Sequence, residues 1–157
     1  MNGSITIPVL ALVFVCGILA GFGVYAMASS GTPQAAVYTA SAPEPIGPYS
    51  QAVQHGNYLF TSGQIGLDPA TGTLAGSVAG EARQTMENLR AVLHKAGIDF
   101  SDVVQTRIYL TDLADFDTVN AVYGEYFDEP YPARATVQVA GLPKGARIEI
   151  EMIAKVR

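Results

Sequence analysis

The order of hydrophobic and polar residues predicts secondary structure from about residue 50 to the C-terminus. Apolar and aromatic residues at 52–54 and 58–61 flank a run of turn formers, which is typical of a β-hairpin. From Val78 onward, apolar residues recur every three or four positions, which predicts an amphipathic helix that begins near Ser77 and ends at Gly97. The apolar stripe of such a helix must pack on another part of the chain.

The second half of the domain adds another strand, helix and pair of strands. Apolar and polar residues alternate over 104–110, which predicts a strand, and Asp115 is expected to cap a second helix. The expected buried stripe of that helix comprises Phe116, Val119, Tyr123 and Tyr126. Residues 135–139 and 148–154 are strand-like. The order β-β-α-β-α-β-β favours an α+β fold with two helices on one face of a mostly antiparallel sheet.

The last strand indicates what each face of the sheet meets. Residues of one parity fit the helix-covered face, namely Ile148, Ile150, Met152 and Ala154. Glu149, Glu151 and Ile153 then emerge on the opposite face. Because the sequence offers no third helix to cover that face, we expect a symmetric oligomer with sites at its interfaces.

A long uncharged segment precedes this domain. Residues 5–28 contain no Asp, Glu, Lys or Arg, and as a helix they would extend about 36 Å, enough to cross a bilayer core of about 30 Å. Ala26-Met27-Ala28 resembles a cleavage site, whereas the length of the apolar run and the absence of a preceding Lys or Arg fit an uncleaved transmembrane anchor. Both interpretations stay open, and membrane orientation is left unset.

These patterns predict a division of the chain and a location. Residues 1–28 are expected to form a signal peptide or transmembrane anchor, 29–40 a linker, and 41–157 the folded domain. We expect the domain to be exported, either periplasmic or anchored to the membrane outside the cytoplasm. The linker is rich in Ser, Ala, Pro and Gly.

Composition and charge narrow the class of protein. A chain of 157 residues allows one folded domain, and its single cysteine, Cys16, excludes a disulfide scaffold. The 14 acidic and 9 basic residues give a net charge of −5, which argues against nucleic-acid binding through a basic field.

Few residues of the domain are suited to catalysis. The domain has no cysteine, His55 and His94 are expected on the surface, and no His or Cys pair has metal-ligand spacing. Arg134 and Glu149 remain, on neighbouring segments of the sequence. They could form a structural ion pair, or Arg134 could clamp a carboxylate while Glu149 moves protons or orients water.

Several ordered motifs resemble those of the RidA/YjgF family of reactive-intermediate (enamine/imine) deaminases. They are IGPYSQA at 46–52, TSGQI at 61–65, QTMENL at 84–89, VNAVY at 119–123 and PARATVQVAGLPKGARIEI at 132–150. The resemblance extends from about residue 41 to residue 157, and the N-terminal segment lies outside it.

The resemblance implies a chorismate-mutase-like α+β fold, assembled as a homotrimer with clefts between subunits. It also implies hydrolysis of 2-aminoacrylate and related enamines or imines to 2-keto acids and ammonia, without a cofactor or metal. Such an enzyme is a C=N hydrolase of the 2-iminobutanoate/2-iminopropanoate deaminase type. Its ligands would be carboxylate-bearing imines or 2-keto acids, with no nucleic acid, and residues 5–28 would add a membrane contact if retained.

The same resemblance assigns roles to individual residues. Arg134 would hold the substrate carboxylate, and Glu149 would orient and activate water. Tyr49, Ser62, Gly63 and Asn120 would line the cleft. Thr136 stands where many members have cysteine, and we expect activity to survive because the chemistry needs no thiol nucleophile.

Two other classes of function stay open from the sequence. One is a non-catalytic small-molecule-binding or chaperone-like stress protein on the same trimer. The other is a ribonuclease or translation inhibitor, against which the net charge of −5 and the expected export both weigh.

Overall fold

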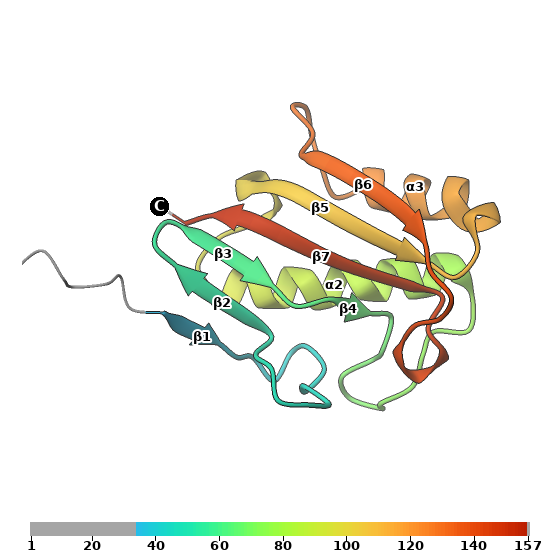
Figure 1. Ribbon diagram of the computed structural model, residues 1–157, viewed down its shortest axis with the longest axis horizontal. Helices are drawn as coiled ribbons and strands as arrows, with labels where there is room; N and C mark the ends of the chain where they lie inside the picture. Colours follow the sequence, from blue (N-terminus) through green and yellow to red (C-terminus); the bar gives the residue numbers. More distant parts are fainter. Residues whose placement is uncertain (1–33, 157) are drawn as a thin grey trace, which may run out of the picture. The chain divides into compact units, whose positions relative to one another are not determined.

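The computed structural model describes residues 34–156, which form one mixed sheet with helices against one of its faces (Figure 1). The strands are β1 (Ala35–Val37), β2 (Ala52–His55), β3 (Tyr58–Thr61), β4 (Gln64–Ile65), β5 (Val103–Leu110), β6 (Ala133–Gln138) and β7 (Ile148–Lys155). Their spatial order is β1-β2-β3-β7-β5-β6, and β4 pairs with β7 beyond the end of β3. Among the strands of residues 34–156, only β5 and β6 pair in parallel.

The hairpin and the long helix form where the sequence predicts them. β2 and β3 are joined by a two-residue turn whose first residue, Gly56, has φ +58°, a conformation that glycine adopts without strain. Helix α2 (Val78–Lys95) begins where the Gly80 N–H donates to Ser77 Oγ over 3.1 Å. It ends at Gly97, which has φ +76° and donates its N–H to His94 O over 3.0 Å.

The second helix is shorter than predicted and is the crossover between the parallel strands. α3 (Phe116–Gly124) follows β5 and precedes β6, as a parallel pair requires. Val119 and Tyr123 are buried as predicted, whereas Phe116 is exposed and Tyr126 lies beyond the end of the helix. Three short 3₁₀ turns complete the elements: η1 (Phe100–Asp102), η2 (Leu113–Asp115) and η3 (Pro143–Gly145).

The hydrophobic core lies between the helices and the sheet, and β7 runs through its middle. Ile148, Ile150, Met152 and Ala154 are each at most 1% exposed, and the side chains between them are half-buried on the opposite face. The predicted parity of the last strand is therefore confirmed. The predicted α+β class, with two helices on one face of a mostly antiparallel sheet, is confirmed with it.

The segment expected to be a linker contains a strand. β1 pairs with β2 through Ala35 opposite Gln54 and Val37 opposite Ala52. The side chain of Gln51, which is almost fully buried, forms hydrogen bonds with the chain that follows β1. Its side-chain amide accepts from the Thr39 N–H over 2.7 Å and donates to Pro43 O over 2.9 Å.

The structure does not support the prediction of a membrane-crossing helix and an exported domain. No helix within residues 34–156 is both long and apolar enough to span a bilayer. α2 has 18 residues, but it mixes apolar residues with Glu and Arg, as expected of a helix that covers a sheet. Residues 5–28, on which the signal peptide, anchor and exported or periplasmic location depended, lie outside the described residues. Those assignments are therefore withdrawn.

Candidate functional site

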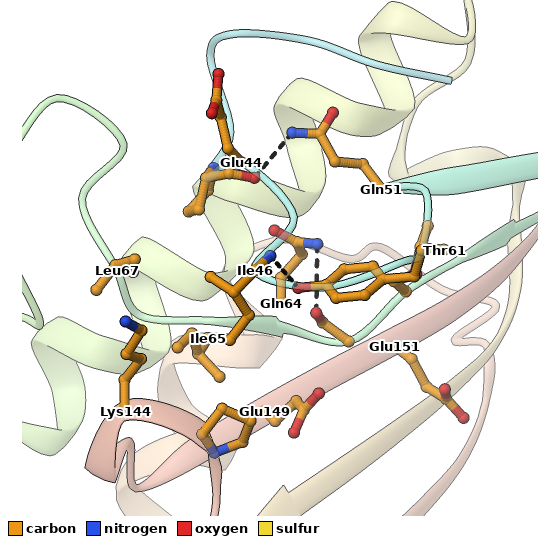
Figure 2. Close-up of a pocket in the computed structure, with 15 residues that line it drawn as sticks. Glu44, Ile46, Gln51, Thr61, Gln64, Ile65, Leu67, Lys144, Glu149 and Glu151 are labelled. Atoms are coloured by element: carbon orange, nitrogen blue, oxygen red, sulfur yellow. Dashed lines mark hydrogen bonds between the residues drawn. The ribbon is translucent and has the colours of Figure 1, made fainter. Parts of the chain in front are cut away.

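A cavity of about 470 Å³ lies at the start of β7, where Glu149 and Glu151 emerge from the sheet (Figure 2). Three segments form its walls: the loop 43–49, the residues joining β3 to β4, and the turn at Pro143 and Lys144. Four of the residues predicted to form the site line this cavity, and we call them the pocket group: Tyr49, Ser62, Gly63 and Glu149.

The carboxyl group of Glu149 is the central titratable group of the cavity. Burial raises its pKa above the usual range of a glutamic acid, and the negative charge of Glu151 raises that pKa further. A carboxylate with a raised pKa is a stronger base, which suits it to accept a proton from water.

Gly63 leaves the space that the Glu149 side chain occupies. A Cβ atom built on Gly63 would lie 2.6 Å from Glu149 Cδ and 2.8 Å from Glu149 Cγ, well inside van der Waals contact. Any side chain at position 63 would therefore displace the carboxylate. This glycine is needed for close approach and not for an unusual backbone angle.

Hydrogen bonds within the walls orient two hydroxyl groups. The Ile46 N–H donates to the Tyr49 hydroxyl oxygen over 3.1 Å, so the Tyr49 proton stays available for a ligand. The Ser62 hydroxyl donates to Ser50 O over 2.6 Å, which leaves its oxygen as an acceptor. The cavity thus offers a donor and an acceptor beside the Glu149 carboxyl group.

Glu151, which the sequence analysis left outside the site, lines the same cavity. Arg107 Nη1 lies 2.7 Å from Glu151 Oε1, and the Tyr109 hydroxyl donates to the same oxygen over 3.2 Å. Glu149 and Glu151 are two residues apart on β7, so their side chains emerge on the same face of the sheet. This spacing could have predicted that Glu151 lines the cavity.

The other predicted site residues lie elsewhere in the chain, and we call them the edge group: Asn120, Arg134 and Thr136. Arg134 is on the edge strand β6, directly opposite Thr106, which is fully buried on the helix-covered face. Paired residues of neighbouring strands share a face, so Arg134 lies on that face too. Its guanidinium stacks 4.8 Å from the ring centre of Tyr123.

Thr136 and Asn120, the other members of the edge group, lie on the same side of the sheet as Arg134. Thr136 is opposite the buried Ile108. Asn120 is on α3, three residues before Tyr123 and therefore on the same side of the helix.

One chain does not bring Arg134 and Glu149 together. β5 lies between β6 and β7, and the two side chains belong to opposite faces of the sheet. Among residues 34–156, Arg134 forms no ion pair, so an Arg134–Glu149 ion pair within one chain, the structural alternative, is not formed.

Comparisons with known proteins concern this folded part of the chain. A family model described as Endoribonuclease L-PSP matches residues 39–156. The 2-iminobutanoate/2-iminopropanoate deaminase of Homo sapiens is 53% identical over 119 residues, which cover 75% of this chain and 87% of that protein.

Solved structures match the fold as well as the sequence. RidA from an Antarctic Psychrobacter bacterium is 46% identical with a TM-score of 0.76, over 78% of this chain and 99% of that one. TdcF of E. coli, solved with bound serine, is 44% identical with a TM-score of 0.76, again over 78% and 99%.

Proposed function

The chain belongs to the RidA/YjgF family, in which close relatives are named imine deaminases, and from that premise we propose that it hydrolyses small 2-imino acids. Its substrates would include 2-aminoacrylate, through its imine form 2-iminopropanoate, and the products would be 2-keto acids and ammonia. The observation that carries this proposal is the Glu149 carboxyl group, half-buried in a cavity with a raised pKa.

The reaction needs one base and a fixed substrate. A protonated imine carbon is electrophilic, so water can attack it once Glu149 accepts a proton from that water. Glu149 then returns that proton to the nitrogen and accepts the proton of the new hydroxyl group. The C–N bond breaks as the C=O bond forms, so ammonia leaves and the keto acid remains. The Tyr49 and Ser62 hydroxyls would hold polar atoms of the substrate, and positioning supplies much of the rate.

We further propose that a neighbouring subunit of a homotrimer supplies the edge group. Arg134 would clamp the substrate carboxylate bidentately, and its stacking on Tyr123 orients the guanidinium for that task. The separation of the pocket group from the edge group supports this arrangement. So does the apolar surface left on the uncovered sheet face, which includes Phe60 and Val137 at 44% and 46% exposure.

Subunit mixing tests the reaction and the shared site together. The Arg134→Ala and Glu149→Gln variants, each expected to be inactive in deamination of 2-iminopropanoate, are coexpressed with different tags and purified as mixed oligomers. If each site of the trimer takes Glu149 from one subunit and Arg134 from the next, one site in three is intact in every mixed trimer. Activity near that fraction is the expected result, and no recovery in verified mixed oligomers would contradict a shared site.

Turnover by the wild-type protein separates an enzyme from a binding protein. An assay that generates 2-aminoacrylate and follows pyruvate and ammonia should show acceleration over spontaneous hydrolysis. Retained binding of a 2-keto acid without acceleration would favour the non-catalytic alternative. The name of the family model makes RNA cleavage the other activity to consider, and the net charge of −5 weighs against it.

A further inference from the structure

The turn between β6 and β7 forms one wall of the cavity and holds a lysine in an unusual backbone conformation. Lys144 has φ +59° and ψ +10°, in the left-handed region. No other non-glycine residue between 34 and 156 has a positive φ. Residues with a Cβ atom adopt this conformation rarely, and it persists where the surrounding structure imposes it, often at functional sites.

Contacts beyond Lys144 impose the conformation. The Ala146 N–H donates to Pro143 O over 3.1 Å, which closes the turn. Arg147 is held by the buried Glu81, whose Oε1 accepts from Arg147 Nε and Nη2 over 2.9 and 2.7 Å. The second Glu81 oxygen accepts from the Arg147 backbone N–H over 2.8 Å. The Lys144 side chain therefore projects from a rigid base.

Among the described residues that line the cavity, Lys144 is the only basic one, and the other charged residues are acidic. Glu151 is already paired with Arg107, and Glu44 accepts from the Tyr38 hydroxyl over 3.0 Å. The Lys144 side chain forms no ion pair with any residue in 34–156. Its ammonium group is thus available to a ligand.

The position of Lys144 matches the far end of a substrate side chain. Figure 2 shows Lys144 and Leu67 at one end of the cavity, with Ile46 and Ile65 between them and Glu149. A ligand whose reacting carbon lies at Glu149 can direct its side chain along these apolar residues toward the ammonium group.

We propose that Lys144 binds a second carboxylate at the end of the substrate side chain, so that the site favours 2-imino and 2-keto dicarboxylic acids such as 2-iminosuccinate and 2-iminoglutarate. This substrate class rests on the proposed deaminase function, because it extends the same cavity. The methylene groups contact Ile46 and Ile65, and the distal carboxylate receives a charge-assisted hydrogen bond from Lys144.

Binding of stable keto acids tests the inference without requiring turnover. Calorimetric titration of the wild-type oligomer should show tighter binding of 2-ketoglutarate than of 2-ketobutyrate. Lys144→Met removes the charge and keeps an apolar stem, so it should reduce that preference about tenfold or more. Lys95→Met, at an exposed lysine at the end of α2, is the matched control and should keep the preference.

A second variant and a second measurement keep the test decisive. Lys144→Gly fits the left-handed backbone without strain and should lose the preference to the same extent as Lys144→Met. In turnover, the ratio of kcat/KM for 2-iminoglutarate to that for 2-iminopropanoate should fall by the same factor in both variants.

Three results would overturn the inference: no preference for the dicarboxylate in the wild type, a preference unchanged in both variants, or an equal loss of affinity for both keto acids. The last result would mean that Lys144 attracts anions in general. A preference that depends on Lys144 in a protein without deaminase turnover would refute the proposed function and leave the dicarboxylate site standing.

Discussion

Replacing Gly63 by alanine should disable catalysis while leaving the fold intact. The new Cβ would lie 2.6 Å from Glu149 Cδ, about 1 Å inside ordinary carbon–carbon contact. The Glu149 carboxyl group, at the end of a flexible side chain, must therefore move by about that distance. A displacement of about 1 Å between a catalytic group and its substrate typically lowers the rate about a hundredfold, equivalent to about 2.7 kcal/mol in activation free energy.

The assay is steady-state deamination of 2-iminopropanoate, with thermal unfolding measured on the same sample. We expect kcat to fall about a hundredfold and the unfolding temperature to change little, because position 63 does not require a positive φ. Gly76→Ala is the matched control, since a Cβ there meets no atom within 4 Å. Wild-type kcat in Gly63→Ala would show that the position of Glu149 is not critical, and loss of folding would assign Gly63 a structural role instead.

Six further substitutions, at five positions, have defined outcomes. Arg134→Ala should abolish deamination without dissociating the oligomer, and Arg134→Lys should restore little, because an ammonium group lacks the planar fork; kinetics and size-exclusion chromatography check both. Glu149→Gln should lower kcat about a hundredfold or more while calorimetry shows retained binding of 2-ketobutyrate, since the amide keeps the shape but cannot act as a base. Glu151→Gln removes a negative charge that raises the pKa of Glu149, so the acidic limb of the pH–kcat/KM profile should move to lower pH; an unmoved limb would contradict this coupling. Glu81→Ala leaves its arginine partner without a buried carboxylate and should lower the free energy of unfolding by about 2 kcal/mol in urea, whereas Glu125→Ala, in an exposed ion pair, should change it little.

The elements of this fold could be predicted from the sequence because their causes are local. Ser77 and Gly97 bound α2 through hydrogen bonds to their own neighbours in the chain. The period of two along β7 sets which residues face the core, so Glu149 and Glu151 were correctly placed on the opposite face. Five ordered motifs between residues 46 and 150 were sufficient to identify the family.

Strand order and cavity walls were decided by tertiary structure. Arg134 and Glu149 are close in sequence, yet β5 inserts between their strands and sends them to opposite faces, which no local pattern encodes. The turn that carries Lys144 is likewise held by Glu81, which is distant in sequence.

Hydropathy measures the solvent preference of a segment, and it predicted a membrane-spanning helix at 5–28, which lies outside the described residues. Among residues 34–156, no helix is long and apolar enough to span a bilayer. Local periodicity determines which residues are buried in a helix or strand, since neighbours along the chain fix the geometry. Which strands pair, and so which side chains share a cavity, depends on contacts between distant segments that form only in the complete fold.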